Sequence, residues 1–407
     1  MFSRLAHRLP LAAAAMVPPT TVAAQADDKC SMMAWLSKQK DNQLGHFVTK
    51  AAGEIKMTIP QTEAPLPAKH KPSMEKLGNA LDHAADLDAA EVARLAQTYA
   101  LPVEKATITM APEVPPPIHR KHNVRLVVDF YCQEKTVQLS KFHKYTYWTF
   151  NGGVPGPFIR AKVGDVLELN LTNDDGTGVA HDLDFHAVTG PGGGGPALYA
   201  EPGETKTGVF KLLQPGLFFY HTAVQRGWIN GSMCGLILVE PEEGLPTVDK
   251  EFYVMQHEVY ATQSEQDKGL VETDLRSMLA ENPLYVVFNG KQQSLISKPL
   301  IVDQGDRVRI FFANGGPNYI SSFHVIGATM DKVYREGDLI STPARALQSS
   351  AVCAAAGAVF ELDFPVPGSY PFLDHSMSRV EKGAMGNIVV KGTPRPDIYD
   401  AKKYQQR

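Results

Sequence analysis

The sequence lacks an excess of positive charge, and this excludes a large class of functions. Its 407 residues include 40 Lys and Arg against 44 Asp and Glu, which gives a net charge of −4. Proteins that bind nucleic acid rely on basic surfaces that neutralise phosphates, so this composition argues against a nucleic-acid partner. Beyond the N-terminus the chain also lacks an apolar run long enough to cross a bilayer, so no membrane span is predicted.

Cysteine is scarce as well, and its spacing excludes several kinds of site. The chain has only Cys30, Cys132, Cys234 and Cys353. No pair forms C-x-x-C or C-x-x-C-H, which argues against a zinc ribbon, a thioredoxin-type redox motif and covalently attached haem. In an oxidising compartment one disulfide could form, and the sequence leaves its pairing open.

The first 26 residues have the layout of an export signal. Arg4 and Arg8 precede an apolar stretch over residues 9–17, and small residues over 23–26 provide a cleavage site. We therefore interpret residues 1–26 as a signal peptide and expect the mature protein in the periplasm or outside the cell. The remaining length is sufficient for two or three domains with cores of their own.

Residues 27–105 differ in composition from the rest of the chain. They are rich in Lys, Ala and Pro, and residues 74–99 carry apolar side chains at helical spacing around an Asp-rich break. The segment is interpreted as a partly helical extension that packs on the domain that follows it.

From residue 106 onward, short β-type runs alternate with Gly, Pro and Asn, and four elements occur twice in the same order. A Gly-Asp turn leads to an alternating strand, then to a strand with histidine, then to a Pro-Gly turn with a strand that ends in His, and finally to Gly and an apolar strand. The four pairs are "VGDVLELNLTN" and "QGDRVRIFFANGG", "HDLDFHAVTG" and "SSFHVIG", "QPGLFFYH" and "VPGSYPFLDH", and "MCGLILVEP" and "GAMGNIVVKG". This duplication predicts an all-β protein of two related barrels, over residues 106–245 and 246–407.

Five histidines lie at equivalent places in the two predicted barrels, at the barrel ends where strands converge. They are His181, His186, His221, His324 and His375. Imidazole is a common ligand for copper and zinc. His181 and His186 are an odd number of residues apart and should point to opposite faces, whereas Asp184 should share a face with His186. A carboxylate beside a metal-bound water suits proton-coupled chemistry. The isolated His257 is interpreted as a structural residue.

Several motifs, in order over about residues 106–400, resemble the two-cupredoxin copper nitrite reductases. They are "APEVPPPIHR", "YWTFNGGVPGPFIR", "HDLDFHAVTG", "QPGLFFYH", "GLILVEP", "YVVFNG", "NGGPNYISSFHVIG" and "FLDHS". The resemblance implies two Greek-key cupredoxin barrels per chain and a homotrimer. It also implies a type 1 copper that accepts electrons and a type 2 copper, between subunits, that reduces nitrite to nitric oxide.

The resemblance implies a complete type 2 site. Its three ligands fall on His186 and His221 of one subunit and His375 of the neighbouring subunit. The proton-handling pair of the family falls on Asp184 and His324. Three neutral imidazoles with an open position form a reactive metal site rather than a closed structural one.

The type 1 site that the resemblance implies is degenerate. His181 and Met233 match two of its ligands, but Thr222 stands where the family has cysteine, and the loop 223–232 contains no histidine. A hydroxyl cannot replace a thiolate as a copper ligand. Cys234 directly follows Met233 and should face away from the old site along a strand. We expect no copper there, with the pocket collapsed and filled by Trp228.

Two functions from different classes remain. The first is a copper oxidoreductase resembling the NO-forming nitrite reductases, with a small substrate such as nitrite, an unknown electron donor and a role in denitrification. The alternative is a non-catalytic periplasmic copper-binding or structural trimer that keeps the interface histidines. Turnover of nitrite with a small reductant distinguishes the two.

Overall fold

The computed structural model describes residues 97, 98, 100–174, 176, 178–224, 232–262 and 269–400. The predicted signal peptide, the predicted helix over residues 74–99 for all but two residues, and Trp228 lie outside these residues. Val103–Lys105, at the end of the predicted extension, forms strand β1 and pairs in parallel with the strand that begins at Arg125.

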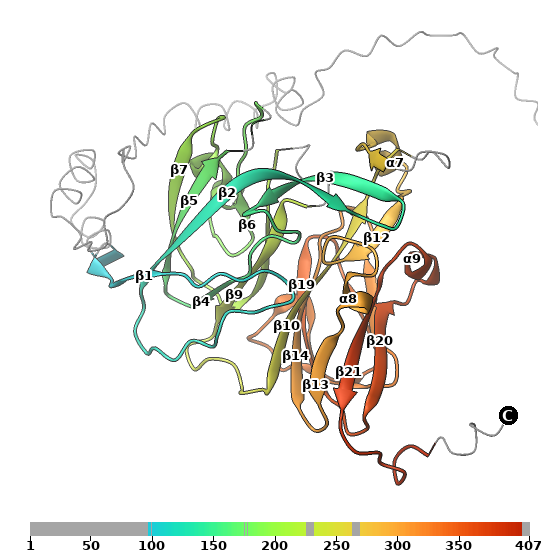
Figure 1. Cartoon of the computed structure of the whole chain (residues 1–407). Coiled ribbons are helices and arrows are strands. Elements are labelled where there is room, and N and C mark those ends of the chain that lie inside the picture. The colour runs from blue at the N-terminus through green and yellow to red at the C-terminus, as the bar shows by residue number, and fades with distance from the viewer. Residues whose placement is uncertain are drawn as a thin grey trace, which may run out of the picture. The chain divides into compact units, whose positions relative to one another are not determined.

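The first half of the described chain forms two sheets, drawn in green in Figure 1. In the larger sheet the order is β11-β3-β2-β5-β7, with β1 on β2; the smaller sheet has the order β4-β9-β8-β6. The bounds are β2 Arg125–Gln138, β3 His143–Phe150, β4 Ile159–Lys162, β5 Val166–Asn173, β6 Asp184–Phe185, β7 Thr205–Lys211, β8 Gly216–His221, β9 Cys234–Glu240 and β11 Gly269–Val271.

The second half also forms two sheets, drawn from yellow to red in Figure 1. Their orders are β12-β10-β14-β19-β16-β17 and β13-β21-β20-β15-β18. The bounds are β10 Lys250–Val259, β12 Tyr285–Phe288, β13 Leu300–Asp303, β14 Arg307–Asn314, β15 Ser321–Val325, β16 Met330–Tyr334, β17 Ala344–Leu347, β18 Ser349–Val352, β19 Ala356–Asp363, β20 Gly368–Asp374 and β21 Met385–Lys391.

The helices among the described residues are short. They are η1 Pro191–Gly194, α5 Gly195–Leu198, α7 Leu275–Leu279, α8 Ser294–Ser297, η2 Arg335–Gly337 and α9 Met377–Glu381. Within the described part of the chain, no helix has the length and apolarity needed to cross a membrane. The all-β prediction is therefore confirmed for the described residues.

The predicted duplication appears in the strand pairing of the two halves. β2 pairs in parallel with β5, as β10 does with β14. β8 pairs with β9 and β6, as β20 does with β21 and β15. The Gly-Asp turns also match. Gly164 and Gly305 have φ of 86° and 90°, in the left-handed region that glycine tolerates. The aspartate after each accepts a hydrogen bond from the backbone N–H three residues earlier, at 2.8 Å in both turns.

Each half encloses its own apolar core because successive strand residues alternate between core and surface. β5 shows this pattern, with Leu167, Leu169 and Leu171 fully buried. A further cluster joins the halves, with Phe219 and Leu236 from the first and Met255 and Phe311 from the second. This continuous burial holds the two barrels in a fixed relation.

Two elements cross between the halves. The β2–β3 hairpin extends from the first sheet toward β12 (Figure 1), and Leu139 and Tyr147 near its tip pack with Val259 and Val287 of the second half. The second element is β11, which follows β10 in the second half of the chain and pairs in parallel with β3 of the first half. One strand of the second half therefore joins a sheet of the first, and the hairpin of the first half packs on the second, across the chain boundary that the sequence predicts at residue 245.

Candidate metal centre

The ends of β6 and β8 bring two histidines and a carboxylate together. Asp184 lies opposite His221 in the antiparallel pair, and the backbone N–H of His186 donates to the carbonyl of Phe219 at 3.0 Å. The possible ligand atoms of Asp184, His186 and His221 all lie within 4.8 Å of one another. The rings of His186 and His221 stand 5.3 Å apart at 86°. As predicted, Asp184 and His186 share a face.

The hydrogen bonds of this group orient its imidazoles toward a common point. Nδ1 of His221 lies 2.8 Å from the carbonyl oxygen of Thr222, which can only accept, so Nδ1 carries a hydrogen and Nε2 faces the group. That Nε2 lies 3.7 Å from Oδ2 of Asp184. Burial lowers the pKa of His186 and the neighbouring His221 lowers it further, against an opposing effect of Asp184. Neutral imidazole nitrogens that converge on one point suit copper(II).

A second histidine pair lies on the other half of the chain. His324 on β15 and His375, directly after β20, have ring centroids 5.2 Å apart. Nδ1 of His324 donates to the carbonyl of Gln348 at 2.6 Å, and the backbone N–H of His375 donates to the carbonyl of Ser322 at 2.8 Å. His375 is exposed and is not part of the group that contains His186 and His221. One described chain therefore carries two separate parts of the predicted ligand set.

The residue before His375 fixes the backbone there. Asp374 is fully buried, and its carboxylate accepts from the backbone N–H of Ser322 at 3.1 Å and of Ser376 at 3.0 Å. It also accepts from the side chains of Gln256 at 2.9 Å and Arg379 at 2.7 Å. A buried carboxylate with this many donors is held in one orientation, so it fixes the backbone that presents His375.

The strand register shows how the paired strands present the histidines of each half. Asp184 lies opposite His221, and His324 lies opposite Leu373. His375 directly follows the end of β20, and its backbone N–H still donates to the carbonyl of Ser322 on β15. The strand that leads from the Pro-Gly turn to the terminal histidine is longer in the second half.

The predicted remnant of a type 1 site is buried and filled with hydrogen bonds. His181 and Thr222 have no exposed surface, and Met233 is 1% exposed. His181 packs edge-on against Trp148 with centroids 5.4 Å apart. The hydroxyl of Thr222 donates to Oδ1 of Asp182 at 2.8 Å. Asp182 has no place in the predicted site, and its contact with Thr222 joins residues forty positions apart, which no local motif could indicate.

Cys234 cannot take the place of the missing cysteine. Met233 packs in the core of the first half, whereas Cys234 belongs to the cluster between the halves. The sulfur of Cys234 lies 3.5 Å from that of Met255, and burial raises the pKa of its thiol to about 12. The prediction that consecutive residues face opposite sides is confirmed. The proposed filling of the pocket by Trp228 lies outside the described residues.

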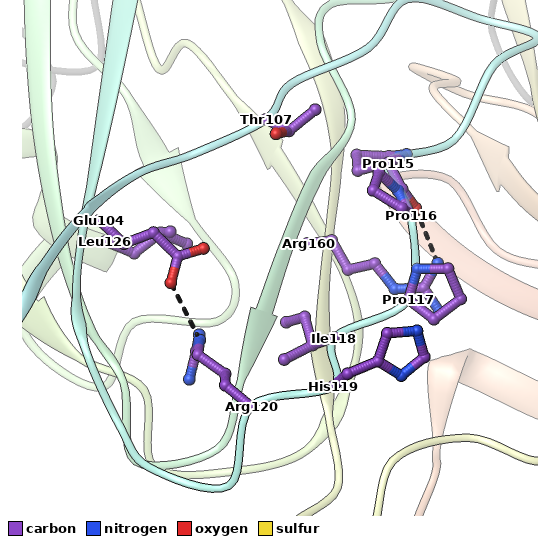
Figure 2. A pocket seen from close by; sticks show the side chains of 10 residues that line it. All are labelled: Glu104, Thr107, Pro115, Pro116, Pro117, Ile118, His119, Arg120, Leu126 and Arg160. Carbon is purple, nitrogen blue, oxygen red and sulfur yellow. Dashed lines mark hydrogen bonds and ion pairs between the residues drawn. The ribbon is translucent and has the colours of Figure 1, made fainter.

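Figure 2 shows a pocket of about 200 Å³ that is separate from these histidines. Its lining includes Pro115–Pro117, Arg120 and Arg160. Arg120 pairs with Glu104 at 3.3 Å, and Arg160 donates to the carbonyl of Pro115 at 2.8 Å. Both arginines are already paired within the protein, so neither is free to bind an anionic ligand in this pocket.

Comparison with known proteins agrees with the histidine chemistry. The family model described as multicopper oxidase matches residues 131–244. A copper-containing nitrite reductase of Neisseria gonorrhoeae is 45% identical over 306 residues, which are 74% of this chain and 78% of the relative. The copper-containing nitrite reductase of Alcaligenes faecalis is 31% identical over 335 residues, which are 75% of this chain and 87% of that protein.

Solved structures give the same result. The copper nitrite reductase of Nitrosomonas europaea matches with a TM-score of 0.57 and 33% identity, over 67% of this chain and 95% of that one. The enzyme of Thermus scotoductus matches with a TM-score of 0.58 and 27% identity, over 66% of this chain and 62% of that one. The two halves are thus tandem cupredoxin barrels, and the chain belongs to the copper-containing nitrite reductase family of oxidoreductases.

Proposed function

We propose that this protein is a nitrite reductase with a type 2 copper alone, held by His186 and His221 of one subunit and His375 of a neighbouring subunit. The observation that carries the proposal is the convergence of Asp184, His186 and His221 within 4.8 Å. Two neutral imidazoles there leave room for a third ligand and for a small substrate. His375 supplies the third imidazole from another copy of the chain.

The surroundings of His375 support an interface with a second copy. Met377 and Ile320 flank it and are 55% and 53% exposed. Large apolar side chains gathered around an exposed potential ligand are typical of a surface that another subunit covers. A cyclic trimer repeats this contact three times and closes, so each copper site would contain residues from two chains.

Copper bound at this site would supply a Lewis acid and a one-electron redox centre. Reduction of nitrite to nitric oxide consumes one electron and two protons and releases one water. Asp184 lies beside the ligand nitrogens and would hand a proton to a substrate oxygen. His324, whose Nδ1 donates to a backbone carbonyl, would present its Nε2 as the other proton-handling group.

The same proposal holds that the type 1 site is empty. Thr222 gives its hydroxyl hydrogen to Asp182, and His181 and Met233 alone form too weak a ligand set for copper. Electrons would then reach the type 2 copper directly from a small reductant rather than from a cupredoxin or cytochrome that docks over a blue site. We place the reaction in the periplasm, as a denitrification step, on the basis of the predicted signal peptide.

The test combines copper stoichiometry, a visible spectrum and nitrite turnover. We expect about one copper per chain and no intense thiolate-to-copper band, because that band requires thiolate coordination. Nitrite should be consumed with excess chemical reductant and not with a cupredoxin or cytochrome donor. Two coppers per chain with a strong visible band would contradict the empty type 1 site. Turnover no faster than that of free copper would leave the copper-binding trimer as the function.

A further inference from the structure

Asp182 lies at the centre of the hydrogen bonds that hold the chain directly after His221. Its Oδ1 accepts from the backbone N–H of Ala223 at 2.7 Å and of Val224 at 3.2 Å. The same oxygen accepts from the hydroxyl of Thr222 at 2.8 Å. One carboxylate oxygen thus gathers three donors from the segment where the family has its type 1 copper cysteine.

One of these bonds acts on His221 through a single peptide unit. The N–H of Ala223 and the carbonyl of Thr222 belong to the same planar amide. Asp182 holds the N–H end, and the carbonyl end accepts from Nδ1 of His221 at 2.8 Å. The backbone N–H of Thr222 is fixed separately by the carbonyl of Met233 at 3.0 Å. Rotation of the amide plane would therefore break the bonds at both of its ends together.

We propose that Asp182 is a positioning residue for His221, and that it replaces the type 1 copper as the anchor of this segment. This rests on the proposed role of His221 as a copper ligand. The carboxylate orients the amide, and its charge polarises the amide so that the Thr222 carbonyl becomes a stronger acceptor. A stronger acceptor on Nδ1 fixes the tautomer and increases the basicity of Nε2 toward copper. The hydrogen-bonded carboxylate of Asp182 thus anchors the segment after His221, as a metal–thiolate bond would in the family.

The test separates the charge of Asp182 from its geometry with three variants. Asp182→Asn keeps an oxygen that accepts from Ala223 but removes the charge, and Asp182→Ala removes both. Thr222→Val is the matched control, because it deletes the hydroxyl and leaves the amide between residues 222 and 223 in place. Copper(II) affinity is measured by chelator competition, and the copper environment by electron paramagnetic resonance.

We expect Asp182→Ala to weaken copper binding about 10–100-fold and to change the resonance spectrum, as for other outer partners of ligating histidines. Asp182→Asn should fall between Asp182→Ala and the wild type, and Thr222→Val should bind copper like the wild type. The proposal is overturned if Asp182→Ala keeps wild-type affinity and spectrum. It is equally overturned if Thr222→Val alone reproduces the loss.

A measurement on the copper-free protein keeps this test independent of the proposed function. Nitrogen NMR of labelled histidine, assigned with a His221→Ala variant, reports which ring nitrogen of His221 carries the hydrogen. We expect Nδ1–H in the wild type and in Asp182→Asn, and a mixture of tautomers in Asp182→Ala. A single Nδ1–H tautomer in Asp182→Ala contradicts the positioning role. If the wild type shows the expected tautomer but holds no copper, only the proposed function fails.

Discussion

At the scale of single residues, position 222 determines what kind of copper protein this chain can be. Thr222 is fully buried, and its hydroxyl is committed to Asp182. A thiolate there would bring a negative charge close to that carboxylate, which would be unfavourable without a metal cation between them. The exchange of cysteine for threonine and the presence of Asp182 are therefore consistent with each other, and both favour a site held by hydrogen bonds.

Asp184 and His324 are the residues through which we expect proton delivery. Asp184→Asn and His324→Ala should each lower nitrite turnover by roughly 10²–10⁴-fold, the range typical of lost acid–base catalysis, while copper stays bound. The measurement is steady-state nitrite consumption with excess chemical reductant, together with copper content. The control is His119→Ala, which removes an exposed histidine outside both histidine groups. Unchanged turnover in both variants would show that these residues only support the ligands.

The residue types of the candidate site could be predicted from the sequence, whereas the contacts between them could not. His186, His221 and Asp184 lie in short motifs whose spacing indicates a shared face, and the structure brings them together. Asp182 was missed because its partners lie about forty residues away in the sequence. Such a pairing follows from the path of the chain and leaves no local signal in either segment.

At the scale of elements, the repeated order of turns and strands was sufficient to predict two barrels. Gly164 and Gly305 each precede a strand with a left-handed turn. β5 then buries alternate residues, whereas β14 is buried on both faces because one face packs in its own core and the other in the cluster between the halves. The crossing elements were not predictable in this way. β11 has only three residues and joins the sheet of the other half. Its stabilisation comes from pairing with β3, which is distant in sequence.

Strand β10 carries a buried histidine that should make the protein sensitive to acid. His257 is fully buried, and its Nε2 lies 3.3 Å from the hydroxyl of Tyr147. Its Nδ1 has no hydrogen-bond partner among the residues that the structure describes. Burial lowers its pKa to about 3, from 6.5 in the unfolded chain. Between pH 6.5 and about pH 3, His257 binds a proton in the unfolded chain but not in the folded protein. The free energy of unfolding therefore falls as the pH falls below 6.5, and the loss continues down to about pH 3.

Replacement of this histidine should remove that part of the acid sensitivity. From pH 7 to pH 4 we expect His257→Gln to lose roughly 3 kcal/mol less unfolding free energy than the wild type, at 1.36 kcal/mol per pKa unit. Chemical denaturation at equal protein concentration measures this, since both proteins share all other titrating groups. The exposed His122→Gln serves as the matched control and should follow the wild type. A parallel loss in His257→Gln and wild type would contradict the expectation.

At the scale of the whole molecule, the proposed copper site is divided between two histidine groups on different halves of the chain. Asp184, His186 and His221 belong to the first barrel, and His324 and the exposed His375 belong to the second. Binding of copper and assembly of subunits should therefore depend on each other. A ligand set shared between chains stabilises the assembly by the free energy of metal binding, so copper should raise the thermal stability of the trimer.

The intersubunit site can be tested with two variants that are each inactive alone. His375→Ala and His186→Ala should each bind no copper tightly, because loss of one of three ligands leaves an incomplete site. When the two are co-expressed in equal amounts, a His375→Ala subunit beside a His186→Ala subunit contributes one complete set of ligands. Random mixing in a cyclic trimer then restores about one quarter of the sites.

The measurement is copper content and nitrite turnover of the mixed trimers, with size determined by light scattering. If all three ligands came from one chain, every chain in the mixture would lack a ligand, and mixing would restore nothing. The mixed sample should instead recover about a quarter of wild-type copper, since only one of the four ordered pairs of neighbouring subunits, His375→Ala beside His186→Ala in the right order, supplies a complete set of ligands. A monomer that binds copper tightly, or a mixture as empty as its components, would exclude the shared site and with it the proposed arrangement of His375.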